Sequence, residues 1–350
     1  MFDFLKRLRR KNTKRVERVE EPVVERTVPP SDFTVFRKRN PRIVSFGSPK
    51  GGVGKSTLAS IAVVSLAVHG LDVAAIDLDL DNETLTTLLL PEEYVEHVRS
   101  IAVRSRRPVL SFSSLILEEP SFNYSIITLN GRYQLRTRSC TGQEVFFPLR
   151  IVPAVDPRVN YHRLRKKLNV QLERYGYRDY RDATLQLYQE MRNRMFHSVF
   201  DLKQKSNVAS AREILYSVAG DKSDVFFIVT DPSNLDFQRV MSPFTAYYDH
   251  LVVIVNKVEK RHIPMVKEFI RESLKEQVPV FIVPFDEFAL SATTKTMLSP
   301  ALSDLSSKAC TSMGGVLSFF YDYNTSVGCE KFYREYQEKH QRLWEALSKK

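Results

Sequence analysis

Short apolar runs alternate with longer amphipathic stretches from Arg42 to about residue 300. The apolar runs lie at residues 42–46, 72–79, 149–155, 197–202, 225–230, 251–258 and 280–285. Helical periodicity fills most of the intervals, as at 181–195 and at 56–70, where Gly70 closes the helix. Continuous apolar strands joined by helices are typical of a parallel sheet built from βαβ units. The pattern therefore predicts a doubly wound, mainly parallel α/β domain over residues 42–300.

Three segments depart from this rhythm. Residues 95–148 contain two β-rich runs around Asn130-Gly131, a pair that favours a tight hairpin turn, and we interpret them as an insertion. Residues 16–41 are charged and contain prolines, as is typical of a linker. Residues 301–350 have helical patterns and predict a helical C-terminal extension.

Composition narrows the class of protein. The chain has 350 residues, 43% of them hydrophobic, which is ample for a buried core. Three cysteines lack metal-ligand spacing, and neither a membrane-spanning apolar run nor a secretory signal is evident. We therefore expect a cytoplasmic protein. Its net charge of +11 predicts an anionic partner.

The stretch SPKGGVGKSTL, residues 48–58, lies between a predicted strand and a predicted helix. Its glycines let backbone N–H groups approach phosphate oxygens, and the following helix directs its positive end at the same anion. In such a phosphate loop Lys55 reaches the β and γ phosphates and the Ser56 hydroxyl ligates Mg²⁺. A second lysine, Lys50, lies five positions earlier.

This loop resembles the deviant Walker A motif of the ParA/MinD ATPases. The resemblance implies a P-loop NTPase fold, ATP and Mg²⁺ as cofactors, and a homodimer formed through the nucleotide. It implies that Lys50 crosses to the phosphates of the partner subunit, where a cation offsets repulsion between two loaded faces. The implied nucleotide-binding residues of the loop are Gly51, Gly52, Val53, Gly54, Lys55, Ser56 and Thr57.

Acidic residues follow two of the predicted strands. Asp77, Asp79 and Asp81 alternate, and in a strand they would crowd on one face unless a cation bound there. The resemblance assigns Asp79 to orienting the attacking water and Asp77 to the vicinity of the metal. The family usually continues with Pro-Gln-Gly or a glycine-bearing loop, whereas this chain has Leu80-Asp81-Asn82.

Two aspartates compete for the Walker B role near Mg²⁺, Asp201 and Asp231. The order of strands and helices in the resembled family favours Asp201, with Asp231 one strand later. The family's prolines after this aspartate are replaced by Lys203 and Gln204. Asn256 ends another strand, where its amide could pair with an adenine edge, as the resemblance also implies.

The resemblance and the charge pattern suggest partners. Residues 1–15 form a short basic amphipathic pattern suited to an anionic membrane surface, or else a basic tail. The basic run 163–167 would suit non-specific DNA binding. Either surface would make the protein peripheral, at the inner face of the membrane or on the nucleoid. An activating protein partner is also implied.

Three functions fit the sequence. The first is an ATPase switch that dimerises with ATP and hydrolyses it slowly to leave a surface, in spatial positioning or partitioning. The second is a nucleotide-binding scaffold with little hydrolysis. The third is a tyrosine kinase of the related bacterial kind, prompted by the Ser48-Pro49 pair and by C-terminal tyrosines, namely Tyr321, Tyr323, Tyr333 and Tyr336.

Overall fold

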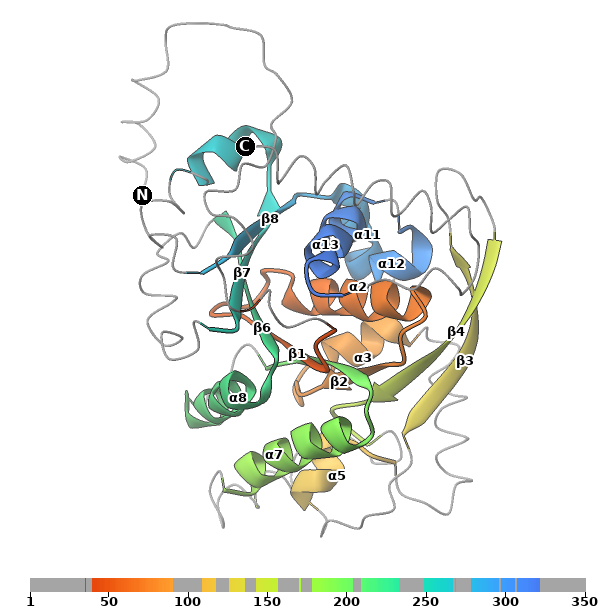
Figure 1. Ribbon diagram of the computed structural model, residues 1–350, viewed down its shortest axis with the longest axis vertical. Helices are drawn as coiled ribbons and strands as arrows, with labels where there is room; N and C mark the ends of the chain where they lie inside the picture. Colours follow the sequence, from red (N-terminus) through yellow and green to blue (C-terminus); the bar gives the residue numbers. More distant parts are fainter. Residues whose placement is uncertain are drawn as a thin grey trace, which may run out of the picture.

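The computed structural model describes residues 35, 40–90, 109–117, 126–135, 143–156, 170, 178–203, 209–232, 249–266, 268, 278–295, 297–305 and 307–321. In this part of the chain the strands form one eight-stranded sheet with the order β3-β4-β2-β5-β1-β6-β7-β8 (Figure 1). The strands are β1 Ile43–Gly47, β2 Val73–Asp77, β3 Ile127–Leu135, β4 Gln143–Val152, β5 His197–Asp201, β6 Val225–Thr230, β7 Leu251–Val258 and β8 Val280–Pro284. Every neighbouring pair is parallel except β3 with β4. The predicted fold class is confirmed.

Helices cover both faces of the sheet (Figure 1). One layer holds α2 Lys55–Val68, α3 Thr84–Leu89, α11 Glu287–Lys295, α12 Pro300–Ser303 and α13 Lys308–Ser318. The other holds α5 Phe112–Leu117, α7 Arg178–Asn193 and α8 Ala209–Lys222. A short 3₁₀ turn, η5, spans Lys260–His262.

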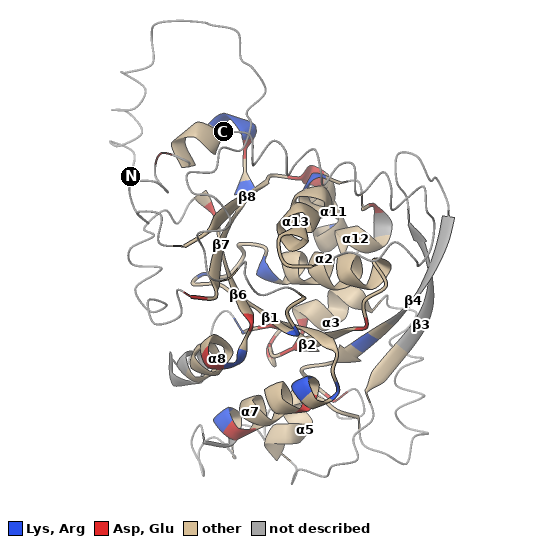
Figure 2. Cartoon of the chain, viewed as in Figure 1, with Lys and Arg blue, Asp and Glu red and all other residues tan. Residues whose placement is uncertain are grey.

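Alternation along the central strands divides the core in two. Phe46 of β1 packs into the cluster that contains α2, whereas Ile43 packs into the cluster beneath α7 and α8. Successive strand side chains point to opposite faces, so an apolar run can fill both layers. Helix α2 is buried almost all round and is mainly uncharged in Figure 2, whereas α7 carries both charge signs. A helix buried on nearly all sides, as α2 is, belongs in the core rather than at the surface.

The predicted turn at Asn130-Gly131 is wrong. Both residues lie inside β3, where Asn130 pairs with Pro148 and Gly131 with Phe147 of β4. An Asn-Gly turn needs positive φ angles, and the continuous antiparallel ladder overrides that local preference. The predicted boundaries of the insertion, linker and C-terminal extension remain predictions.

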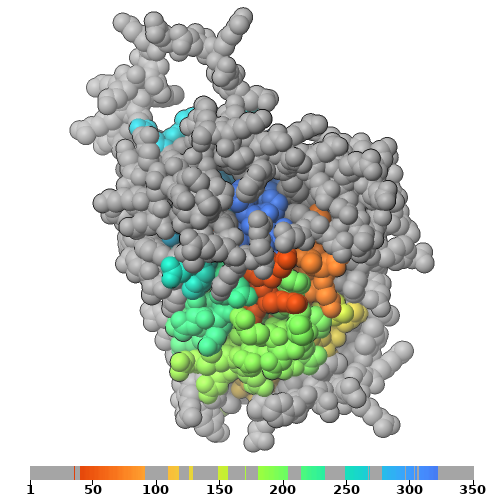
Figure 3. Space-filling model, viewed as in Figure 1, coloured from red at the N-terminus to blue at the C-terminus, as the bar shows by residue number. Residues whose placement is uncertain are grey.

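The described chain begins and ends close together. Asn40 N–H donates to the Phe320 carbonyl at 2.8 Å, and in Figure 3 the red early residues lie beside the blue late ones. The predicted amphipathic segment 1–15 and the basic run 163–167 lie outside the described residues. Within the described residues, no helix combines the length and apolar character needed to cross a bilayer.

Candidate functional site

The phosphate loop joins β1 to α2 and contains two glycines with left-handed backbones. Gly52 has φ 78° and Gly54 has φ 89°. A Cβ at Gly54 would lie 2.4 Å from Asn256 Nδ2, so the site has no room for another side chain there. No side chain caps the N-terminus of α2, which leaves its first N–H groups directed at the loop. This arrangement suits an anion.

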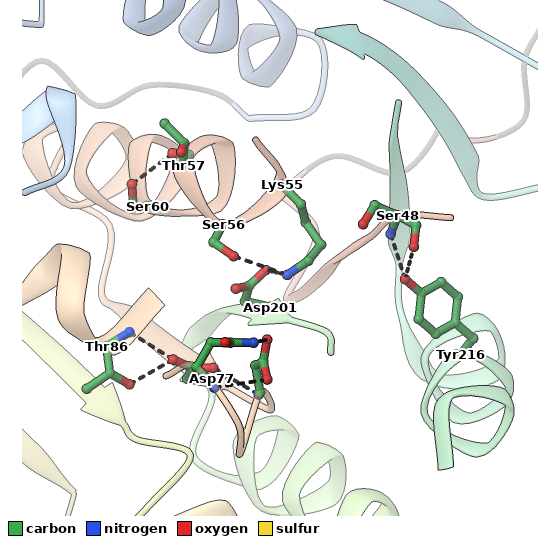
Figure 4. Close-up of polar contacts among 11 residues, drawn as sticks. Ser48, Lys55, Ser56, Thr57, Ser60, Asp77, Thr86, Asp201 and Tyr216 are labelled. Atoms are coloured by element: carbon green, nitrogen blue, oxygen red, sulfur yellow. Dashed lines mark hydrogen bonds and ion pairs between the residues drawn. The ribbon is translucent and has the colours of Figure 1, made fainter. Parts of the chain in front are cut away.

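Lys55 and Asp201 meet at the centre of the site (Figure 4). Both side chains are fully buried, and Lys55 Nζ pairs with Asp201 Oδ1 and lies 3.2 Å from Ser56 Oγ. Burial raises the pKa of the Asp201 carboxyl above its ordinary value, while the Lys55 charge acts in the opposite direction. The second oxygen, Asp201 Oδ2, is buried and accepts no hydrogen bond from any described residue. An orphaned carboxylate oxygen here can take a cation or a water.

Asp77 lies beside Asp201 because their strands are in register. Its Oδ2 accepts hydrogen bonds from the N–H and hydroxyl of Thr86, both at 2.9 Å, and its Oδ1 accepts from Asp79 N–H at 3.0 Å. Burial, followed by the charge of Asp201, raises the pKa of Asp77 to about 7. The charge of Asp201 therefore disfavours ionisation of its neighbour Asp77.

Asp79 lies in a loop and not in a strand, since β2 ends at Asp77. The predicted crowding of alternate carboxylates on one strand face is therefore wrong beyond that residue. Instead the loop turns back, and Asp79 accepts bonds from Asp81 N–H at 3.1 Å and from Asn82 Nδ2 at 3.0 Å. Asp81 itself pairs with Lys203 Nζ at 2.7 Å.

Asn256 reaches the phosphate loop from the carboxyl end of β7. Its Nδ2 donates to the Val53 carbonyl at 2.9 Å, so in this structure the amide braces the loop. The sequence reasoning missed its neighbour Lys257, whose Nζ lies 2.5 Å from the Gly52 carbonyl oxygen. Lys257 has φ 61°, and the pairing of β7 with β8 shifts register here. A left-handed lysine at a bulge leaves no signal in a single sequence.

Tyr216 of α8 is a second residue that the sequence reasoning missed. Its hydroxyl accepts from Ser48 N–H at 2.6 Å and donates to the Ser48 carbonyl at 2.7 Å (Figure 4). The ring also fills the space above Gly47, where a Cβ would lie 2.9 Å from it. Tyr216 thus fixes the start of the loop, two residues before Lys50.

A cavity of about 510 Å³ opens beside the loop. This volume is typical of a site for a small organic ligand. Of the predicted site residues, Gly52, Gly54, Lys55, Ser56, Thr57, Asp79 and Asn256 line it. Lys50, Gly51, Val53, Asp77 and Asp201 are not among its lining residues. The far wall is formed by residues that follow β8, namely Phe285, Asp286, Ala289, Leu290, Thr293 and Thr294.

The metal-ligating capacity of the site is modest. The described residues contain no group of three or more acidic, His or Cys side chains arranged to hold a metal. Mg²⁺ does not require one, because it commonly takes one or two protein oxygens together with waters and substrate phosphates. The Ser56 hydroxyl and the orphaned Asp201 Oδ2 fit that pattern.

The position of Asp201 also distinguishes it from Asp231. Asp201 ends β5, which lies between β2 and β1, and it contacts Lys55. Asp231 follows β6, on the other side of β1. The carboxylate that pairs with Lys55, and Asp77 in register with it, therefore come from strands on one side of β1.

Among solved structures, the MinC:MinD cell division protein complex from Aquifex aeolicus has a TM-score of 0.48 and 16% identity, covering 82% of this chain and 100% of that one. A septum site-determining MinD complexed with Mg-ADP, from Pyrococcus horikoshii OT3, scores 0.48 at 15% identity, covering 78% and 93%. Cobyrinic acid a,c-diamide synthase from Mycobacterium smegmatis, with bound ADP and magnesium, scores 0.44 at 19% identity, covering 75% and 90%.

No curated protein sequence matches the chain significantly. The family profile described as the CobQ/CobB/MinD/ParA nucleotide binding domain, in contrast, matches residues 44–298, which include the phosphate loop and the strands around it. The chain therefore belongs to the CobQ/CobB/MinD/ParA nucleotide-binding domain family.

Proposed function

We propose that this protein is an ATP-dependent dimerising switch of the ParA/MinD type. The observation that carries the proposal is the different placement of the two lysines in one phosphate loop. Lys55 is fully buried against Asp201, whereas Lys50 is exposed at the surface. The loop thus has one cation inside its own site and a second one where another subunit could meet it.

The residues around the loop fit Mg-ATP. The left-handed glycines and the uncapped start of α2 suit its phosphates, and the adjoining cavity suits a nucleoside. Bound Mg-ATP would supply the phosphoryl group and the metal charge that hydrolysis requires. Ser56 and Asp201 would hold the metal. Asp77, on the neighbouring strand, would lie near the metal and attract it electrostatically.

Each charged residue has a distinct proposed role in hydrolysis. Lys55 would exchange its pairing with Asp201 for the phosphates and stabilise negative charge there. Asp79 would accept a hydrogen bond from the attacking water and orient it, because its carboxylate lines the cavity. Lys50 would neutralise charge on the partner subunit's nucleotide. This last contact would couple hydrolysis to dimerisation.

Light scattering with Mg-ATP and Mg-ADP tests the proposal. We expect a dimer with ATP and a monomer with ADP. Lys50→Ala should bind ATP within about threefold of the parent affinity, because Lys55 still contacts the phosphates in the same subunit. The variant should nevertheless stay monomeric. Lys222→Ala, an exposed lysine at the end of α8, is the matched control and should dimerise normally. A Lys50→Ala protein that still dimerises with ATP would contradict the role of Lys50.

The surface to which such a switch binds is the second part of the proposal. We expect co-sedimentation with anionic liposomes in ATP and not in ADP, and its loss when residues 1–15 are deleted, since two weak anchors act together in a dimer. DNA is tested in parallel, and ATP-dependent sedimentation with DNA alone would assign the nucleoid instead. Absence of phosphate release under every condition would favour the scaffold alternative.

One observation weighs against the tyrosine-kinase alternative. Tyr321 is buried, its hydroxyl donates to the Pro41 carbonyl at 3.0 Å, and burial raises its pKa far above the usual range. It is therefore poorly accessible for phosphorylation. Tyr323, Tyr333 and Tyr336 lie outside the described residues.

A further inference from the structure

The loops after β2 and β5 are joined by an ion pair. Lys203 Nζ lies 2.7 Å from Asp81 Oδ2. The Lys203 side chain is 11% exposed and that of Asp81 is 47% exposed, so the pair lies at the edge of the site and is partly shielded from water. Both residues stand where the sequence departs from the family pattern, and the structure places the two departures in contact.

Each partner of this ion pair is connected to a residue of the site. Asp81 N–H donates to Asp79 Oδ1 at 3.1 Å, so the residue that pairs with Lys203 also holds the Asp79 carboxylate. Lys203 follows Asp201 by two residues, and its segment is anchored by the hydrogen bond from Leu202 N–H to the Phe46 carbonyl at 3.0 Å. The ion pair therefore ties the Asp79 loop to the segment that carries Asp201.

A backbone contact already joins the two loops nearer the strands. Leu78 N–H donates to the Asp201 carbonyl at 3.0 Å, immediately after β2. That contact fixes the base of the Asp79 loop but not its tip, where Asp81 and Asn82 lie. At the tip, the ion pair of Asp81 with Lys203 adds a second contact with the segment after β5, and two fixed points determine the orientation of a short loop better than one.

We propose that Lys203 and Asp81 are a positioning pair, which holds the Asp79 carboxylate in a fixed relation to Asp201. The proposal deepens the hydrolytic function proposed above and rests on it for its catalytic consequence. Neither side chain lines the cavity, so the pair acts through Asp79 and not on a ligand. It should affect the rate of hydrolysis more than the affinity for nucleotide.

A double-mutant cycle tests the pair in the full chain. Lys203→Met and Asp81→Asn should each lower kcat about tenfold, because a displaced catalytic group costs rate steeply. The KM for ATP and the Kd for Mg-ADP should change by less than about twofold. The double variant should be no slower than either single one, because the second change removes a contact that is already lost. Lys203→Arg should retain the parent rate.

Glu190→Gln is the matched control. It removes an ion pair of similar length, 2.6 Å from Glu190 Oε1 to Arg194 Nε, on α7, which lies in the helix layer opposite α2. The rate of this variant should equal that of the parent. The proposal would be overturned if the control lowered kcat as much as the single variants do. It would also be overturned if the double variant lowered kcat about a hundredfold, as two independent effects would.

Hydrogen exchange of the nucleotide-free protein separates this inference from the proposed function. The backbone amides of residues 81 and 82 should exchange about tenfold faster in either single variant than in the parent. In the double variant they should exchange no faster than in the single variants. This readout does not depend on hydrolysis. If no preparation hydrolyses ATP, the proposed function fails while exchange still decides whether the pair orders the loop. Unchanged exchange in both single variants would refute the pair.

Discussion

At the amino ends of the central strands, the Asp224 carboxylate accepts hydrogen bonds from the backbone. Asp224 Oδ2 accepts hydrogen bonds from the N–H groups of Arg42 and Ile43, at 2.9 and 3.0 Å, and Oδ1 lies 3.6 Å from Arg192 Nη2. At the carboxyl ends, Asp77, Asp79 and Asp201 are all buried, and Asp201 pairs with the buried ammonium of Lys55.

The two ends differ in how completely their charges are balanced. Asp224 is matched by N–H donors and by a nearby guanidinium, so its charge has a structural use. At the other end, Asp201 keeps a buried oxygen without a donor among the described residues, and burial raises the pKa of Asp77 to about 7. Excess buried negative charge is costly to stability unless a cation binds. Incomplete balance therefore distinguishes the binding end of this sheet from the structural end.

The largest effect is expected from removing the cation at the binding end. Lys55→Met leaves the Asp201 carboxylate buried without its partner and should lower the free energy of unfolding by about 4 kcal/mol. Urea denaturation of the nucleotide-free protein measures it. The variant should also lose nucleotide binding, since we propose that the same amine binds the phosphates.

Two further variants sharpen the Lys55 result. Lys55→Met combined with Asp201→Leu should recover most of the loss, because an apolar pair has no uncompensated charge. Asp224→Ala at the structural end should cost only about 2 kcal/mol, from two lost N–H contacts, and should leave nucleotide binding unchanged. If Lys55→Met and Asp224→Ala lowered the free energy of unfolding equally, and the double variant recovered none of it, the charge imbalance would not affect stability.

Much of this arrangement could be predicted from the sequence, because it follows from local patterns. Apolar runs of strand length located the parallel strands, and the glycines around Lys55 located the phosphate loop. The order of strands favoured Asp201 over Asp231, and the structure places Asp201 against Lys55. These features depend on neighbouring residues along the chain, or on an order of strands and helices that a sequence displays.

The remainder depends on contacts between residues far apart in the chain. Tyr216 reaches Ser48 across 168 positions and Lys257 reaches Gly52 across 205, and neither pairing leaves a periodic signal. The Asn130-Gly131 turn failed for a related reason, since pairing with β4 outweighed a local preference. The ion pair of Lys203 with Asp81 joins two loops whose course no pattern of apolar residues predicts.

A smaller effect, of opposite sign at the two ends, is expected when pH is varied. Asp77 has a folded pKa of about 7 against 3.8 for the unfolded chain, so between these values the folded state holds a proton that the unfolded state has lost. Its contribution is complete below pH 4 and is lost as pH rises to about 7. At the structural end, burial lowers the pKa of His197, so that contribution is present above pH 6.5 and is lost as pH falls.

Urea denaturation of the nucleotide-free protein between pH 4 and 8 checks these signs. Relative to the parent, Asp77→Asn should remove a decline of stability with rising pH, and His197→Gln should remove a decline with falling pH. Mg-ATP should reverse the first effect and leave the second, because a cation at the binding end favours the ionised Asp77 carboxylate. If Asp77→Asn leaves the pH profile unchanged, the carboxylate is already balanced in the absence of ligand. The contrast between the two ends of the sheet would then reduce to Lys55 and Asp201 alone.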